Sequence, residues 1–353
     1  MPYFRPPPKL AQLLGSFARD QRWLITIVAD PDAMASALAL KRILSHRVQD
    51  VTITKLNRLS RPDNLAMVRY TRLKMRTFRP AMLPRYTHFA VVDSQPTHNP
   101  ALMEIPFSII IDHHPLPETP YDAAYVDIRP KYGATSTMMT EYLQSLKIRP
   151  GKLLATALQF GIKTDTDNFE RHFYDGDLRA YQYLNRFADH NLLSRIARSE
   201  FHLHWLEFFA KACTNLYPVG SSGQFVYLGD VDNPDLLVNV ADFFMRVYEI
   251  RWAAVAGSYK NTVVVIFRSD GISRNVGKFA THAFGSLGSA GGHRAMARAE
   301  FPIDAAQGAD VEMFVFKRLM ASAKLRFKRA APRQGQETAV ETPLLPHHQD
   351  DIL

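Results

Sequence analysis

Short apolar runs alternate with amphipathic segments along the first half of the chain. The run at residues 23–30 is rich in β-branched side chains, which predicts a buried strand, and apolar positions recur at helical spacing directly after it, over residues 33–44. Similar patterns predict further strands at 51–56, 88–93 and 107–114, and helices at 133–143 and 152–162. Strands that alternate with helices are typical of a parallel α/β sheet.

After Pro218 the pattern changes to longer strand-like runs. Two of these runs are separated by Tyr259, Lys260 and Asn261, which predicts a hairpin and therefore an antiparallel or mixed sheet. The rest of this half predicts a strand at 224–231, a helix at 275–284, a Gly-rich loop at 285–292, a strand near Phe301 and a helix at 309–327.

The length of 353 residues exceeds what one hydrophobic core usually supports, so we expect two domains. The boundaries are predicted where the pattern changes. They give an N-terminal α/β domain at 1–190, a polar helical connector at 191–217, a smaller α/β domain with a mixed sheet at 218–330, and a tail at 331–353. The tail is predicted to be disordered because it is rich in Pro, Gln, Thr and Asp with little apolar periodicity.

Composition narrows the class of protein further. No stretch approaches eighteen uncharged apolar residues and the N-terminus has no signal-peptide core, so we expect no membrane contact. The single cysteine, Cys213, excludes an internal disulfide and a cysteine-based zinc cluster, which favours a cytoplasmic protein. The net charge of +9 favours anionic partners, although an excess of basic residues can also serve solubility alone. One basic cluster, at residues 69–85, is a candidate nucleic-acid contact: Arg69, Arg72, Lys74, Arg76, Arg79 and Arg85.

Acidic residues end three of the predicted strands. Asp30, Asp93 and Asp112 each follow an apolar run, and the carboxyl ends of parallel strands meet at one edge, where α/β proteins place their active crevice. Alone, Asp30-x-Asp32 is a weak signal because Asp is common in turns and at helix N-caps. Burying an acid and two imidazoles at Asp112-His113-His114 is costly without pairing or a metal, so this triplet is more specific.

Two further motifs lie downstream. Asp165 follows a predicted helix within GIKTDTDNF, at residues 161–169. The sequence GSAGGHRAMA, at 288–297, carries Gly291, Gly292 and His293, and glycines allow backbone N–H groups to approach an anion closely.

In this order the motifs resemble the DHH phosphoesterase family, which is named after the triplet at 112–114. The Gly-Gly-His segment resembles the family's C-terminal DHHA1 substrate-binding domain, and the resemblance covers residues 20–325 approximately. It implies a two-metal phosphoesterase whose Mn²⁺ ions, with Mg²⁺ as the alternative, activate water for an in-line displacement.

The resemblance also implies roles for individual residues. Asp93 corresponds to the carboxylate that bridges the two ions, Asp30 binds one ion, and Asp32, His113 and Asp165 bind the other. His114 faces the substrate phosphate and Asp112 orients the histidines. In the second domain, His293 with Gly291 and Gly292 holds phosphate, and Arg268 is a further partner.

One position departs from the family pattern. Many members have a metal-binding histidine four residues before the first Asp of DxD, and this chain has Thr26 there. RecJ-like members also lack this histidine. The sequence therefore predicts a Mn²⁺-dependent phosphoesterase for short oligoribonucleotides, 3′-phosphoadenosine 5′-phosphate (pAp) or dinucleotides. The alternative is a catalytically weakened nucleotide- or RNA-binding module, and the family also allows a homodimer.

Overall fold

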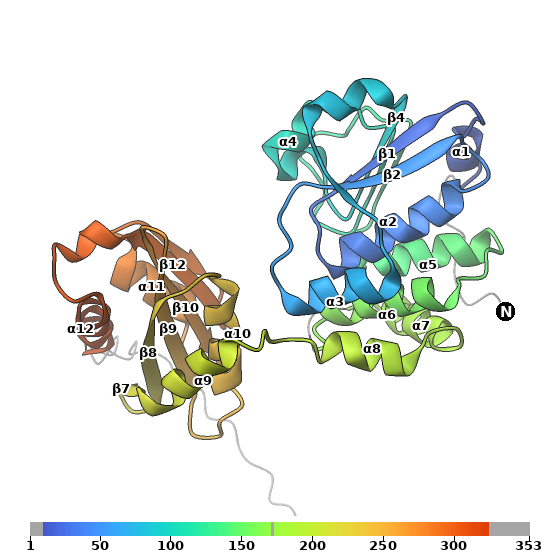
Figure 1. Ribbon diagram of the computed structural model, residues 1–353. Coiled ribbons are helices and arrows are strands. Elements are labelled where there is room, and N and C mark those ends of the chain that lie inside the picture. Colours follow the sequence, from blue (N-terminus) through green and yellow to red (C-terminus); the bar gives the residue numbers. More distant parts are fainter. Residues whose placement is uncertain (1–9, 171–172, 325–353) are drawn as a thin grey trace, which may run out of the picture. The chain divides into compact units, whose positions relative to one another are not determined.

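The computed structural model describes residues 10–170 and 173–324 (Figure 1). The tail that the sequence predicts at 331–353 lies outside the described residues. Contacts divide the chain into two compact units: the first runs to Thr214 and includes Asp232–Asn239, and the second contains Asn215–Val231 and the residues from Val240 onward. No described helix is long and apolar enough to cross a membrane.

The first unit is built on a six-stranded sheet of order β3-β2-β1-β4-β5-β6, in which every neighbouring pair is parallel. Its strands are β1 (Arg22–Ile27), β2 (Asp50–Lys55), β3 (Arg76–Thr77), β4 (His88–Val92), β5 (Ile109–Asp112) and β6 (Tyr125–Ile128). The strand order reverses between β1 and β4. Ligands of open α/β sheets bind at such a reversal, outside the carboxyl ends of the strands.

Helices cover the sheet because its side chains alternate between two apolar faces. Trp23, Ile25 and Ile27 of β1 join the larger core on one face, whereas Leu24 belongs to a second core with Phe107. Figure 1 shows α2 and α5–α8 gathered on one side of the strands. The helices are α1 (Leu10–Gly15), α2 (Pro31–Leu44), α3 (Pro62–Thr71), α4 (Pro100–Met103), α5 (Thr135–Ser145), α6 (Lys152–Asp165), α7 (Asp175–Asn185), α8 (His190–Ala197) and α9 (Trp205–Thr214), with 3₁₀ turns η1 (Pro80–Arg85) and η2 (Pro96–His98).

The second unit has a mixed sheet of order β11-β12-β10-β9-β8-β7, in which β8 and β9 are parallel and the other pairs are antiparallel. Phe279 and Phe284 of one helix and Val315 and Leu319 of another pack into its core. Its elements are β7 (Tyr217–Val219), β8 (Gly223–Asp230), β9 (Trp252–Tyr259), β10 (Thr262–Ser269), α11 (Val276–Phe284), β11 (Ser289–Gly292), β12 (Met296–Pro302), η3 (Ile303–Ala306) and α12 (Val311–Lys324). Helix α10 (Asp235–Phe244) is divided between the units, since its residues up to Asn239 belong to the first.

These two sheets confirm the predicted fold class and the β9–β10 hairpin. Two local predictions are wrong. Asp165 is the last residue of α6 and does not follow it, and residues 289–292 form strand β11 because they pair with β12. The predicted domain boundaries stay a prediction, although Leu193 and Ile196 of α8 pack into the first core.

Candidate metal centre and active site

Asp30 and Asp32 stand at the turn from β1 into α2. Asp30 is the N-cap of α2, and its Oδ1 accepts a hydrogen bond from the Ala33 N–H at 2.8 Å. This bond satisfies one of the free N–H groups of the first helical turn. Asp32 therefore falls in the first turn, where its side chain is buried and directed into the protein.

The carboxylate of Asp32 is held by the N-terminus of α5. Its Oδ2 accepts from the Thr135 N–H at 2.6 Å and its Oδ1 accepts from the Ser136 N–H at 2.7 Å. A helix N-terminus favours negative charge, so α5 holds this carboxylate in one orientation. Each oxygen keeps a lone pair for a further ligand.

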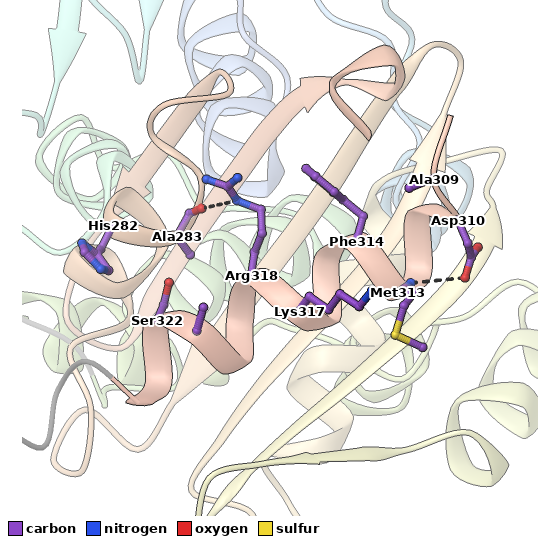
Figure 2. A pocket seen from close by; sticks show the side chains of 10 residues that line it. His282, Ala283, Ala309, Asp310, Met313, Phe314, Lys317, Arg318 and Ser322 are labelled. Atoms are coloured by element: carbon purple, nitrogen blue, oxygen red, sulfur yellow. Dashed lines mark hydrogen bonds between the residues drawn. The ribbon is translucent and has the colours of Figure 1, made fainter. Parts of the chain in front are cut away.

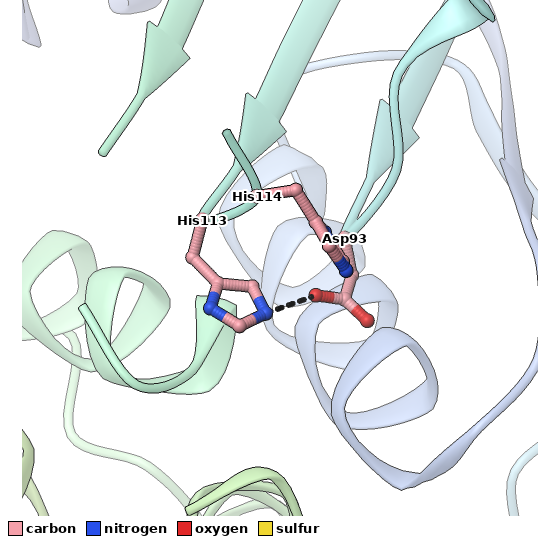
Figure 3. Close-up of side chains that lie close together, drawn as sticks. All are labelled: Asp93, His113 and His114. Atoms are coloured by element: carbon pink, nitrogen blue, oxygen red, sulfur yellow. Dashed lines mark ion pairs between the residues drawn. The ribbon is translucent and has the colours of Figure 1, made fainter. Parts of the chain in front are cut away.

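Asp93 follows β4 in the left-handed region, with φ of 58°. Its side chain is buried, and its Oδ1 accepts from the Thr135 hydroxyl at 2.9 Å. Asp and Asn tolerate this backbone conformation better than most residues. The turn therefore directs the carboxylate toward the end of β5 (Figure 3).

His113 lies between two carboxylates. Its Nε2 is 3.4 Å from Asp93 Oδ1 and 3.2 Å from Asp165 Oδ2, and its Nδ1–H donates to the Tyr132 carbonyl at 3.0 Å. The Nδ1 bond fixes the ring with Nε2 toward the carboxylates. Among the described residues, this buried Nε2 makes no hydrogen bond.

The structure thus brings together Asp32, Asp93, His113 and Asp165, whose candidate ligand atoms lie within 4.8 Å of one another. Asp30 is close enough to Asp32 and His113 to interact with them electrostatically. Three carboxylates and one imidazole with an unused nitrogen are a donor set that suits Mn²⁺ or another first-row divalent ion. The residues present therefore fit a metal centre.

His114 and Asp112 form a hydrogen-bonded pair beside this cluster. His114 Nδ1 lies 2.8 Å from Asp112 Oδ1, and Asp112 Oδ2 accepts from Gln95 Nε2 at 2.7 Å. Asp112 is fully buried, whereas the His114 side chain is 43% exposed. Because Nδ1–H is bound to Asp112, Nε2 of His114 is left to contact a ligand.

Burial and mutual repulsion shift the pKa values of the acidic side chains in this cluster. Burial, with the nearby charge of Asp32, raises the pKa of Asp30 to about 6, and burial with the charge of Asp165 raises the pKa of Asp32 to about 6. Burial and four neighbouring carboxylates hold the pKa of Asp93 well above its usual range. Burial lowers the pKa of His113, but the carboxylates of Asp165 and Asp32 outweigh it and raise that pKa to about 9. The imidazolium thus supplies the positive charge that a metal ion would replace.

Stability of the metal-free protein should fall as pH rises. Asp30 and Asp32 have raised pKa values, so their contribution is complete below their ordinary value of 3.8 and is lost as pH rises through about 6. The contribution of His113 is complete below 6.5 and is lost through about 9. We expect the Tm in EDTA to decrease from pH 5 to pH 9, and the gain in Tm from Mn²⁺ to increase over that range. Calorimetry would contradict this if the Tm in EDTA rose with pH.

Gly161 of α6 leaves space for the Asp32 carboxylate. A Cβ at this position would lie 2.5 Å from Ser136 Oγ and 3.1 Å from Asp32 Oδ1. We expect Gly161→Ala to cost about 1–3 kcal/mol of unfolding free energy and to weaken Mn²⁺ binding, because Asp32 must shift. Gly15→Ala is the matched control, since no atom lies within 4 Å of its Cβ. Denaturant unfolding and metal titration of both variants check this, and equal Mn²⁺ affinity would contradict it.

A buried ionic network supports His113, and the sequence analysis missed it. Arg129 binds Asp127 at 2.6 and 2.7 Å and Glu141 at 2.7 Å, and its Nη1 lies 3.2 Å from the hydroxyl of Tyr132. The carbonyl of Tyr132 accepts the hydrogen bond from Nδ1–H of His113. The sequence gives little signal for this network, since Asp127 and Glu141 look like ordinary strand and helix polar residues.

Asp177 is a second residue that the sequence analysis missed. It is fully buried, and it accepts from the Gly133 N–H at 2.8 Å, the Thr137 hydroxyl at 2.5 Å and the Tyr174 N–H at 2.7 Å. These bonds fix the start of α5, which in turn holds Asp32. In the sequence, Asp177 looks like a solvent-exposed acid in the first turn of a helix.

The predicted phosphate-binding residues lie in the second unit. Arg268 pairs with Asp242 at 2.6 Å. His293 is exposed, and Gly291 and Gly292 are paired in the β11–β12 ladder. Gly292 has φ of 144°, and a Cβ there would lie 2.4 Å from the Met296 carbonyl oxygen, so the backbone itself requires glycine.

A cavity of 610 Å³ also lies in the second unit, between α11 and α12 (Figure 2). Its lining combines apolar side chains with His282, Asp310, Lys317 and Arg318. None of the predicted site residues lines it.

Thr26 occupies the position of the family histidine. It is fully buried in β1, and its hydroxyl lies 3.2 Å from the Thr54 hydroxyl of β2. The side chain at this position therefore forms a hydrogen bond between strands β1 and β2.

Residues 24–162 match the family model described as the DHH family, N-terminal domain. The chain therefore contains a DHH domain at these residues. The matched DHH domain lies within the first unit and contains Asp30, Asp32, Asp93 and the triplet at 112–114.

A curated relative of this chain is an uncharacterized protein of Methanocaldococcus jannaschii, 34% identical over 281 residues. The match covers 79% of this chain, and the chain spans 57% of the length of that relative.

Two solved structures are similar. An exopolyphosphatase-related protein from Bacteroides fragilis has a TM-score of 0.64 at 13% identity, covering 89% of this chain and 94% of that one. It shares the fold. A putative family II inorganic pyrophosphatase from Methanococcus jannaschii has a TM-score of 0.45 at 14% identity, covering 86% and 99%.

Proposed function

We propose that this protein is a Mn²⁺-dependent phosphoesterase that hydrolyses small nucleotide substrates with a metal-activated water. The observation that carries the proposal is the group of Asp32, Asp93, His113 and Asp165, whose ligand atoms lie within 4.8 Å of one another around an imidazole nitrogen with no hydrogen bond. The DHH domain match at residues 24–162 supports the same chemistry.

In this proposal Asp93 and Asp30 would hold one divalent ion, and Asp93 with Asp32, His113 and Asp165 would hold a second. Such ions would lower the pKa of water and neutralise charge on phosphate oxygens. The protein contributes fixed positions for these ligands. The N-terminus of α5 orients Asp32, the Thr135 hydroxyl orients Asp93, and the Tyr132 carbonyl orients His113.

His114 is the proposed contact to the substrate phosphate. The hydrogen bond to Asp112 raises the pKa of His114. The ring therefore carries a proton at Nε2 more readily, and this Nε2–H donates a hydrogen bond to an anionic oxygen. Burial raises the pKa of Asp112, but the bonds from His114 and Gln95 outweigh it and keep this carboxylate ionised. Asp112 thus positions His114.

The proposed substrates are short oligoribonucleotides, pAp and dinucleotides. His293, Gly291 and Gly292 are proposed to hold a phosphate group, and Arg268 would join them if it exchanged its Asp242 partner for the ligand. A basic chain with an exposed His293 favours an anionic substrate.

A substrate panel with Mn²⁺ and Mg²⁺ in parallel tests the function. We expect release of mononucleotide from a dinucleotide or of phosphate from pAp, and loss of this activity in His113→Ala. Cyclic dinucleotides and pyrophosphate complete the panel. If the wild type turns over none of these substrates with either metal, the enzymatic proposal is wrong.

The second candidate function is a nucleotide- or RNA-binding module without turnover. The observation that favours it is a basic stretch, residues 69–85, whose members Arg69, Arg72, Lys74, Arg76, Arg79 and Arg85 are all exposed. Binding through several phosphates weakens steeply with ionic strength. Tight, salt-sensitive RNA binding without metal-dependent turnover would favour this candidate over hydrolysis.

A further inference from the structure

A third histidine lies beside the DHH triplet. His98 ends the η2 turn that follows β4, and its ring centroid is 5.3 Å from that of His114 with the ring planes at 81°. One nitrogen of each ring and a carboxylate oxygen of Asp112 lie within 4.8 Å of one another. From the sequence alone, His98 would be interpreted as a surface or packing residue.

The backbone fixes the orientation of the His98 ring. The N–H of Gln95 donates to Nδ1 of His98 at 3.3 Å. Because Nδ1 is the acceptor in this bond, the ring proton of the neutral form is on Nε2. His98 therefore presents an N–H donor on the side of the ring away from the η2 turn.

Gln95 positions both imidazoles. Its backbone holds His98, and its Nε2 donates to Asp112 Oδ2 at 2.7 Å, while Asp112 Oδ1 binds His114. The Tyr121 hydroxyl donates to Gln95 Oε1 at 3.1 Å, which completes the bonding of this buried amide. Gln95 and Asp112 are buried, whereas His98 and the side chain of His114 reach solvent. A buried frame that presents two imidazoles to solvent is the arrangement of a binding site.

We propose that His98 is a second substrate-contacting residue, which donates from Nε2 to an oxygen of the phosphate group that His114 faces. This inference rests on the proposed function, because the phosphate at His114 is part of it. The two donors meet the ligand from different directions, since their rings are close to perpendicular. Such a pair holds a phosphate in one orientation relative to the carboxylate cluster.

Phosphate binding tests the proposal separately from turnover. The affinity of the Mn²⁺-loaded protein for inorganic phosphate is measured by calorimetry, together with kcat/KM for bis(p-nitrophenyl) phosphate and the Kd for Mn²⁺. We expect His98→Ala to weaken phosphate binding and to lower kcat/KM by about 10-fold each, with Mn²⁺ affinity unchanged, because one hydrogen bond to an anion is lost. His98→Gln restores part of the loss through its amide donor. His282→Ala, an exposed histidine of α11, is the control and behaves as the wild type.

The outcomes separate the two proposals. Weaker phosphate binding in His98→Ala supports the contact even if the wild type shows no turnover, which would count against the phosphoesterase alone. Unchanged phosphate affinity in His98→Ala overturns the contact even if the wild type is an active enzyme. A loss of Mn²⁺ affinity equal to the loss of phosphate affinity also overturns it, because His98 would then act on the metal centre. A wild-type protein that binds no phosphate would also overturn the proposed contact.

Discussion

Asp93→Asn is expected to abolish Mn²⁺-dependent turnover, by on the order of 10³-fold, while the protein stays folded. Asn keeps the size of Asp93 and the oxygen that accepts from Thr135 at 2.9 Å, and it tolerates φ of 58°. It removes one negative charge from a buried group in which Asp32, Asp30 and Asp165 all raise the pKa of Asp93. Stability in EDTA should therefore stay equal or rise by about 1 kcal/mol, and the stabilisation by Mn²⁺ should fall.

Asp93→Ala provides the comparison. Alanine at a left-handed position costs about 1–2 kcal/mol, and the buried Thr135 hydroxyl loses its partner at a further cost of about 1–3 kcal/mol. Turnover is lost in both variants, but only Ala lowers stability in EDTA. Denaturant unfolding with and without Mn²⁺, next to the activity assay, separates ligand loss from misfolding. Substantial turnover by Asp93→Asn would exclude the bridging role.

Arg129→Met is expected to destabilise the protein by about 3–5 kcal/mol. The Arg129 side chain is 13% exposed and its partners Asp127 and Glu141 are each 4% exposed, so the substitution leaves two carboxylates buried without their cation. Tyr132 also loses a contact to the guanidinium, which is expected to loosen the carbonyl that orients His113. We therefore also expect Mn²⁺ affinity to fall, by about 10-fold.

Neutralising the two carboxylates should reverse most of this loss. In the variant Arg129→Met with Asp127→Asn and Glu141→Gln, no charge remains to be buried, so the unfolding free energy returns toward that of the wild type. The exposed Arg69 gives the matched control, since Arg69→Met should change stability by less than about 0.5 kcal/mol. A loss below about 1 kcal/mol in Arg129→Met would show that the network contributes little.

The sequence predicted the elements that local pattern determines. The strands that end near Asp30, Asp93 and Asp112 have apolar runs of the right length, and three acids at the ends of parallel strands had to meet at one edge. The sequence alone therefore predicted an acidic site at this edge of the sheet. The family resemblance then assigned candidate metal ligands within it.

The residues that hold the candidate metal ligands in place could not be predicted from the sequence, because their bonding partners are distant in sequence. Asp32 binds the N–H of Ser136, 104 positions away, and Asp177 binds that of Gly133, 44 positions away. Gln95 and Arg129 are polar residues without a periodic pattern, and their bonding becomes visible only after β4, β5 and β6 are placed side by side. Local pattern carries no information about such pairings.

The left-handed backbone at Asp93 also constrains how this protein can evolve. Asn and Gly are the residues that best tolerate this conformation, and each is one base change away from either Asp codon. A lineage can therefore lose the charge at this position in a single mutational step and still inherit a folded chain. Folded descendants without hydrolysis are easily reached from an active ancestor, and the residue at position 93 distinguishes them in a genome sequence.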